Sequence, residues 1–149
     1  MIIKDTNVEP IVEHDGTCLG YFFFEKEELR KETMGGYLEF FNEFELRGGA
    51  ALEPHSHDSD EFYYLLRGEA MVRVGEEESP LRPGQMVRIP RNEIHSIRTV
   101  DDEGFRAIAF AVSYMPADKV GYTAYPADGS GPRWVPEGTD VRESEHVDQ

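Results

Sequence analysis

Residues 49–68 read GAALEPHSHDSDEFYYLLRG, and this stretch decides the fold because it combines strand periodicity with a cluster of chelating side chains. Side chains two apart on a strand point to the same face, so His55 and His57 can present two imidazoles to one ion. Residues 58–60 are turn formers, which predicts that the chain reverses there. Glu61 then opens a neighbouring antiparallel strand and returns a carboxylate to the two imidazoles.

A second stretch, residues 84–99, reads GQMVRIPRNEIHSIRT and supplies a third imidazole. Its pattern predicts a strand that ends at Pro90, a turn over residues 91–93 and a second strand that carries His95. The chain has five histidines, and three of them fall in these two stretches. This concentration predicts a metal site whose ligands are His55, His57, Glu61 and His95.

The two stretches together resemble the paired motifs of the cupin superfamily. The first motif is G, five residues, HxH, three residues, E, six residues, G, and it is matched at Gly49, His55, His57, Glu61 and Gly68. The second is G, five residues, PxG, two residues, H, three residues, N; it is matched at Gly84, Pro90 and His95, with Asn92 for the glycine and Thr99 for the asparagine. Neither departure is at a ligand, and Asn tolerates the left-handed backbone that a turn glycine supplies. The resemblance covers roughly residues 37–113 and implies an all-β fold, a single-domain cupin β-barrel of the jelly-roll type with a metal inside.

The predicted ligand set limits the metal. Three imidazoles and one carboxylate leave about two positions open on an octahedral ion. Such a mixed nitrogen and oxygen set suits one divalent metal ion, with Fe(II) as our first expectation and Mn(II), Ni(II), Co(II) or Zn(II) as alternatives. Open positions allow a small-molecule substrate or water to bind beside the protein ligands.

The net charge of the chain limits its partners. With 30 acidic against 15 basic residues the formal charge is −15, which argues against nucleic acids and anionic membranes because both would be repelled. No stretch reaches the ~18 apolar residues of a membrane-spanning helix, and the N-terminus lacks a signal-peptide pattern. We therefore expect a soluble, cytoplasmic protein.

The length of 149 residues suits one domain. We expect N-terminal strands and a charged segment that pack on the barrel over residues 1–36, and the barrel core over residues 37–113. An irregular extension rich in Gly, Pro and aromatic residues should follow over residues 114–136, and a disordered acidic tail over residues 137–149. Within the core, residues 70–74 and 85–89 suggest a hairpin around a polar connection, and residues 105–113 are typical of a strand buried on both faces.

The segment before the first motif alternates between apolar and charged side chains. One predicted face carries Leu38, Phe40, Phe44 and Leu46, and the other carries Glu39, Glu43, Glu45 and Arg47. Asn42 interrupts the apolar face, which indicates either a buried hydrogen bond or a pocket. We predict that Asn42 lines a substrate pocket whose apolar wall is formed by Phe40 and Phe44. Tyr63 shares the face of Glu61, so it is the candidate catalytic residue.

The sequence favours a metal-dependent enzyme that acts on a small polar organic molecule, with a mononuclear Fe(II) dioxygenase, an oxidoreductase, as the leading interpretation. One alternative is a lyase or isomerase in which the ion is a Lewis acid and Tyr63 is the base. Another is a non-catalytic ligand-binding cupin that the metal stabilises. The resemblance also implies a homodimer. The sequence leaves open which of four strand arginines faces the pocket: Arg73, Arg88, Arg98 or Arg106.

Overall fold

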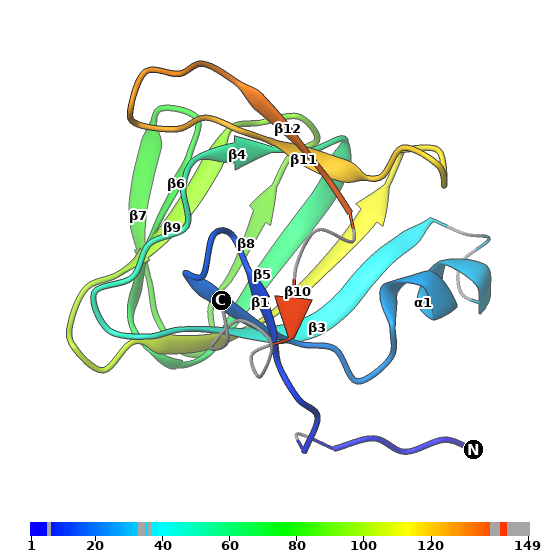
Figure 1. Cartoon of the computed structure of the whole chain (residues 1–149). Helices are drawn as coiled ribbons and strands as arrows, with labels where there is room; N and C mark the ends of the chain where they lie inside the picture. Colours follow the sequence, from blue (N-terminus) through cyan, green and yellow to red (C-terminus); the bar gives the residue numbers. More distant parts are fainter. Residues whose placement is uncertain (6, 33–34, 36, 138–140, 143–149) are drawn as a thin grey trace.

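The computed structural model describes residues 1–5, 7–32, 35, 37–137 and 141–142, which form two antiparallel sheets and one short helix. The sheets face each other and enclose a barrel, so the expected all-β jelly roll is confirmed (Figure 1). Sheet A has the strand order β13 (Val141–Arg142), β1 (Ile11–Glu13), β2 (Cys18–Tyr21), β3 (Leu38–Leu46), β10 (Phe105–Ser113), β5 (Ser59–Gly68) and β8 (Met86–Ile89). Sheet B has the order β12 (Arg133–Pro136), β11 (Gly121–Ala124), β4 (His55–Ser56), β9 (His95–Thr99), β6 (Ala70–Val74) and β7 (Glu77–Leu81).

Successive core strands cross between the sheets more often than they pair with each other. β4 pairs with β9 and β11 in sheet B, whereas β5 pairs with β10 and β8 in sheet A, so the hairpin predicted around residues 58–60 is wrong. β6 pairs with β7 and not with β8, so the second predicted hairpin is also wrong. Both errors have one physical reason. A half-buried strand shows the same period-two pattern whether its neighbour in sequence lies beside it or across the barrel.

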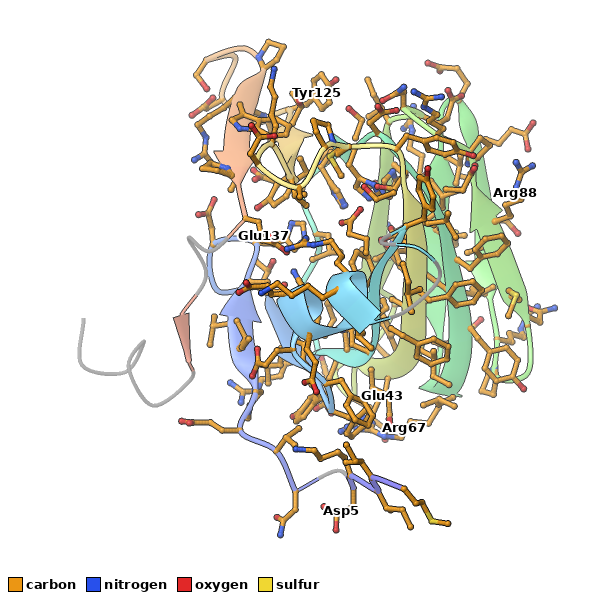
Figure 2. The ribbon with its side chains drawn as sticks, turned by 90° about the vertical axis from the view of Figure 1, so that its right-hand side faces the viewer. Asp5, Glu43, Arg67, Arg88, Tyr125 and Glu137 are labelled. Atoms are coloured by element: carbon orange, nitrogen blue, oxygen red, sulfur yellow. The ribbon has the colours of Figure 1, made fainter. Side chains whose placement is uncertain are left out.

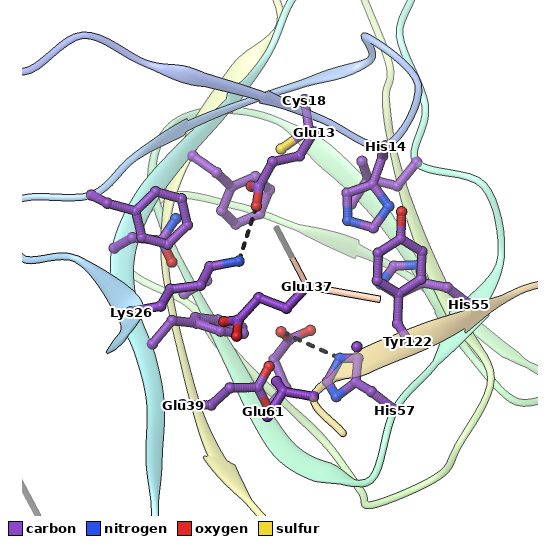
Figure 3. Close-up of a pocket in the computed structure, with 18 of the residues that line it drawn as sticks. Glu13, His14, Cys18, Lys26, Glu39, His55, His57, Glu61, Tyr122 and Glu137 are labelled. Atoms are coloured by element: carbon purple, nitrogen blue, oxygen red, sulfur yellow. Dashed lines mark hydrogen bonds and ion pairs between the residues drawn. The ribbon is translucent and has the colours of Figure 1, made fainter. Parts of the chain in front are cut away.

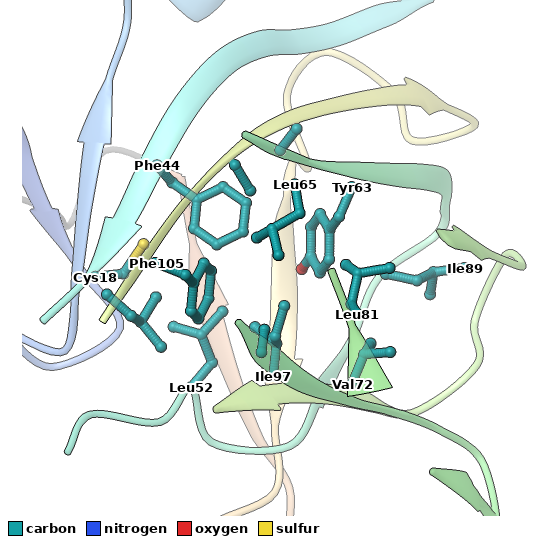
Figure 4. Packing of buried hydrophobic residues seen from close by; sticks show 14 residues of the cluster. Cys18, Phe44, Leu52, Tyr63, Leu65, Val72, Leu81, Ile89, Ile97 and Phe105 are labelled. Carbon is teal, nitrogen blue, oxygen red and sulfur yellow. The ribbon is translucent and has the colours of Figure 1, made fainter. Parts of the chain in front are cut away.

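The inner faces of the two sheets meet in one apolar core (Figure 4). On β5, Tyr63 and Leu65 point inward and are buried, while Phe62 and Tyr64 on the outer face are partly exposed, as the alternation predicts. Phe105 is fully buried on the neighbouring β10. Each large apolar side chain buried in this way stabilises the fold by about 1.5–3 kcal/mol.

β10 lies between β3 and β5, and its inner side chains are buried as expected. Its outer face is not covered by another layer of the described chain. Phe110 instead stacks between Phe41 and Phe62, with ring centroids 5.5 and 4.7 Å away, and Phe41 remains 50% exposed. The prediction of burial on both faces is therefore only half right, because neighbouring aromatic rings give the outer face partial cover.

A β-bulge in β3 changes the expected face of Glu39. Ala111 on β10 pairs with Phe40, but the next residue, Val112, pairs with Leu38, so Glu39 is an extra residue in the ladder. A bulge sets two residues of one strand against one of its partner and redirects the extra side chain. Glu39 is only 6% exposed and lines the same pocket as Phe40 and Phe44, so its predicted position on the face opposite to theirs is wrong.

The segments that flank the core add a helix and a hairpin to the barrel. α1 (Lys26–Glu32) packs against β3. Arg30 of this helix binds both carboxylate oxygens of Glu137, at 2.8 and 2.7 Å, just beyond β12. The extension expected to be irregular contains a hairpin of β11 and β12, and β11 pairs with β4. Helix α1 is far too short to cross a bilayer, and no other helix among the described residues is long and apolar enough to do so.

The tail over residues 137–149 is described at only three positions. Glu137 follows β12, and Val141–Arg142 form β13 against β1. The rest of the predicted disordered tail lies outside the described residues.

Candidate metal centre

Strands from both sheets bring the four predicted ligands together. His55 on β4 lies directly opposite His95 on β9, and both belong to sheet B. His57 follows β4 in the short link to sheet A, where Glu61 occupies the inner face of β5. One ligand atom from each of the four residues lies within 4.8 Å of the others, and all four side chains are buried.

The turn that precedes β9 also fixes the link that carries His57. Asn92 has a φ of 64°, which confirms the left-handed backbone predicted for it. Its backbone N–H donates to the carbonyl oxygen of His57 at 3.0 Å, and its side-chain amide donates to Asp58 at 3.1 Å. The residue that replaces the motif glycine therefore ties the two motifs to each other.

Backbone carbonyls set the tautomers of two of the histidines. Nδ1 of His55 lies 2.9 Å from the carbonyl oxygen of Glu53, and Nδ1 of His95 lies 2.9 Å from that of Glu93. A carbonyl oxygen only accepts hydrogen bonds, so Nδ1 carries the proton in both rings. Nε2 of each ring is then left with a free lone pair, which is the arrangement found in metal-bound histidines.

Buried polar atoms of the cluster lack hydrogen-bond partners among the described residues. Nε2 of His95 and Oε1 of Glu61 lie 3.2 Å apart, and neither has such a partner. Nδ1 of His57 also has none, while Nε2 of the same ring faces Glu61 at 3.5 Å. Buried polar atoms without partners cost free energy, and a metal ion is one of the few species that satisfies several at once. The donor set therefore fits a divalent metal ion.

The charges in the cluster are coupled. Burial alone would raise the pKa of Glu61, but the neighbouring His57 holds this pKa well below its ordinary value. For His57, burial opposes the charged form, yet the Glu61 carboxylate raises its pKa on balance. Burial and the adjacent imidazoles lower the pKa of His55 well below its ordinary value. Without metal, Glu61 is thus a carboxylate that His57 partly neutralises, and His55 is neutral.

A pocket opens between the sheets, and three of the four predicted ligands, His55, His57 and Glu61, line it (Figure 3). Its lining includes the residues predicted for the substrate side, Phe40, Asn42 and Phe44, and also Tyr63. The side-chain amide of Asn42 donates to the carbonyl oxygen of Glu43 at 2.9 Å, while its own buried Oδ1 accepts no hydrogen bond from the described residues. Asn42 therefore combines the two roles that the sequence left open.

Tyr63 lies at the wall of the pocket and is 3% exposed. Its ring packs against Phe44, with centroids 5.0 Å apart. Burial, followed by the charge and hydrogen bond of Glu61, raises the pKa of Tyr63 well above its ordinary value. The phenol is therefore protonated.

Sequence reasoning missed six polar residues of the pocket: Glu13, His14, Lys26, Glu39, Tyr122 and Glu137. They come from the β1–β2 hairpin, α1, the bulge in β3, β11 and the end of β12. Lys26 lies 3.2 Å from Glu13 and 4.8 Å from the ring centroid of Phe22. Glu39 accepts a hydrogen bond of 2.5 Å from Ser59, and burial raises its pKa. None of these residues belongs to a sequence motif. Only His14 could have been noticed, because histidine is rare in this chain.

None of the four strand arginines lines the pocket formed by the described residues. Arg73, Arg88 and Arg98 have side chains more than half exposed, and Figure 2 shows Arg88 pointing away from the barrel. Arg106 is 16% exposed but binds Glu43 at 2.8 Å and stacks on Tyr21. None of the four arginines therefore faces this pocket, and Lys26 places a positive charge there instead.

Part of the chain resembles a known protein family. Residues 42–111 match the family described as Cupin domain. The polyketide synthase CurC of Streptomyces cyaneus is 31% identical over 95 residues, which cover 63% of this chain and 62% of the relative, so the chain spans less than two thirds of that protein. An oxalate-binding protein of Thermotoga maritima is 26% identical over 85 residues, covering 56% of this chain and 70% of the relative.

The fold agrees with that of solved structures. The crystal structure of a predicted oxalate decarboxylase from Thermotoga maritima superimposes with a TM-score of 0.65, covering 76% of this chain and 99% of that one. Only 19% of the residues are identical, so this likeness concerns the fold alone.

Proposed function

Because the chain carries a small cupin-type domain, we propose that it is a metal-dependent enzyme that acts on a small polar organic molecule. The observation that carries the proposal is the buried group of His55, His57, Glu61 and His95, which borders an open pocket. A divalent ion held there would supply Lewis acidity, or the binding of dioxygen if it is iron.

The pocket indicates the kind of molecule that fits beside the ion. Phe40 and Phe44 give it an apolar wall, and the unpartnered Oδ1 of Asn42 gives it a hydrogen-bond acceptor. The carboxylate of Glu13 is already paired with Lys26 and that of Glu137 with Arg30. A molecule with an apolar or aromatic body and an oxygen-bearing head group suits this lining.

The leading candidate is a mononuclear Fe(II) dioxygenase. Three histidines and one glutamate suit Fe(II) while leaving room for two exogenous ligands. In this function Asn42, Phe40 and Phe44 orient the substrate, and the buried walls exclude bulk water from it. Turnover should then require dioxygen.

The second candidate is a metal-dependent lyase or isomerase, in which the ion is a Lewis acid. The sequence alone suggests Tyr63 as the base in this function. The raised pKa of Tyr63 instead favours a phenol that donates a proton or a hydrogen bond, at least until a cation is bound beside it. Tyr63→Phe should abolish this turnover while metal binding persists.

A third candidate is a ligand-binding cupin without turnover, which the similarity to an oxalate-binding protein favours. In that case the ion holds the ligand and stabilises the barrel. Metal removal would then lower stability, and no compound in a substrate screen would be converted.

The first experiment is a measurement of metal content on protein purified without chelators or nickel affinity resin. Inductively coupled plasma mass spectrometry should find close to one divalent ion per chain, and His95→Ala should lose it. Ser96→Ala, at the next position of β9, is the matched control and should keep the metal. Iron together with substrate-dependent oxygen uptake supports the dioxygenase, and oxygen-independent turnover supports the lyase or isomerase. A wild-type protein that takes up no metal on reconstitution would refute the whole proposal.

A further inference from the structure

A fourth histidine, His14, reaches the pocket from outside the two motifs. It lies in the tight turn between β1 and β2 and lines the pocket on the same side as His55 (Figure 3). Its imidazole centroid is 4.7 Å from that of His55. No motif spacing links His14 to the other histidines, so its place beside a metal ligand is a product of the fold.

The backbone at His14 is unusual for a residue with a side chain. His14, Asp15 and Gly16 follow one another with φ angles of 50°, 55° and 87°. Left-handed backbone is uncommon for residues other than glycine, with Asp and His among the more frequent exceptions, and residues held in it gather at functional sites. Thr17 fixes the turn, since its backbone N–H and hydroxyl both donate to the carbonyl oxygen of His14, at 3.2 and 2.7 Å.

The ring of His14 is held by packing and not by hydrogen bonds from the described residues. It stacks on Tyr122 of β11, with centroids 4.8 Å apart and an interplanar angle of 29°. Its Nδ1 is shielded from solvent and has no hydrogen-bond partner within the described part of the chain. An imidazole carries at least one N–H, so its ring can donate a hydrogen bond to a ligand in the pocket.

Other charged groups of the pocket already have partners. Lys26 is paired with Glu13, and Glu39 accepts a hydrogen bond from Ser59. His14 differs from these charged groups because its Nδ1 has no hydrogen-bond partner among the described residues. The left-handed turn and the stacking on Tyr122 hold its ring against the predicted ligand His55. A structural role alone would be filled equally well by an apolar aromatic side chain, without the cost of an unpartnered buried nitrogen.

We propose that His14 is a positioning residue that hydrogen-bonds the exogenous ligand of the ion, whether a small anion or the oxygen atom of a bound substrate. The proposal rests on the proposed function, because it requires an ion with an open position. It adds a second point of recognition, so that a ligand is oriented by the metal at one atom and by an imidazole beside it.

The test uses the full chain reconstituted with Co(II), whose visible absorption reports its ligands, and azide as the probe anion. Azide is titrated at neutral pH into wild type, His14→Phe and His14→Asn. The phenylalanine keeps the stacking on Tyr122 but has no ring nitrogen, and the asparagine tolerates the left-handed backbone but is too short to replace the imidazole. Asp15→Asn, an exposed position of the same turn, is the matched control.

Both His14 variants should keep one Co(II) per chain and bind azide about tenfold more weakly, which corresponds to about 1.4 kcal/mol. Asp15→Asn should bind azide as wild type does. Unchanged azide affinity in both His14 variants would overturn the proposal and leave the proposed function intact. Loss of Co(II) from both variants would overturn it too, by making His14 a ligand of the ion. A wild-type Co(II) protein that binds no azide would contradict the open position, and with it both proposals.

Discussion

Two motif glycines with the same backbone conformation should differ sharply in their tolerance of a side chain. Gly68 closes the first motif with a φ of 80°, and Gly84 opens the second with a φ of 86°. A Cβ added at Gly68 would lie 2.3 Å from the carbonyl oxygen of Gly104 and 2.8 Å from the Cα of Phe105. A Cβ added at Gly84 would meet nothing within 4 Å. The pair thus separates backbone strain from steric overlap.

The expected magnitudes follow from this difference. The left-handed conformation costs an alanine about 1–2 kcal/mol, and this cost is common to both sites. Gly84→Ala should therefore lose about 1–2 kcal/mol of unfolding free energy. Gly68→Ala must also displace β10, with which Gly68 pairs at Phe105, and overpacking of this kind adds about 1–3 kcal/mol. In a domain of this size the added loss corresponds to a further fall of roughly 2–12 °C in melting temperature.

Urea denaturation followed by circular dichroism, on metal-free protein in chelator, measures both free energies without a contribution from metal binding. Equal midpoints for the two variants would refute the reasoning, because they would show that the approach of β10 does not require glycine at position 68. A larger loss at Gly84 would refute it more strongly.

Three further predictions address the metal, the pocket and the assembly. Removal of the metal by a chelator should lower the melting temperature reversibly, because free metal at 100 times its Kd stabilises the fold by about 2.7 kcal/mol. Scanning calorimetry should show this stabilisation by metal in wild type and not in His95→Ala. Burial raises the pKa of Glu39 above its ordinary 4.5, so stability from this group is present below that pH and is lost as the pH rises towards the folded pKa. The unfolding free energy of Glu39→Gln should therefore equal that of wild type in acid and exceed it at neutral pH. The difference should be about 1.4 kcal/mol for each tenfold gain in the proton affinity of Glu39 on folding. Urea denaturation at several pH values measures it, and parallel pH profiles of the two proteins would contradict this prediction. The homodimer also stays a prediction: sedimentation velocity should find twice the chain mass of 17.0 kDa, and a single 17.0 kDa species at high concentration would rule it out.

The metal ligands could be predicted from the sequence because their spacing is local and their chemistry is rare. His55 and His57 are two residues apart, and the strand that carries Glu61 begins at once after them. The partner strands could not be predicted. Alternation in β4 and β5 shows which side chains face inward, but an inward face is the same in a hairpin and in two strands on opposite sheets.

The pocket was only partly predictable for a related reason. Phe40, Asn42 and Phe44 follow regular alternation, so their shared face could be read from the sequence. Glu39 could not, because a bulge is decided by pairing with β10 and leaves no mark in the local pattern. His14 and Tyr122 meet through contacts between distant segments, for which sequence spacing carries no information.

The predicted metal ligands and the polar residues that line the pocket beside them come from different stretches of the chain. All four metal ligands fall inside residues 42–111, whereas His14, Lys26, Tyr122 and Glu137 lie before or after them. Under the proposed function, mutations in the flanking segments would remodel the entrance and the recognition of a substrate while the four predicted ligands stay in place. Substrate preference would then diverge by replacement of the two ends alone, and chimaeras that exchange those ends between relatives should transfer specificity without rebuilding the metal centre.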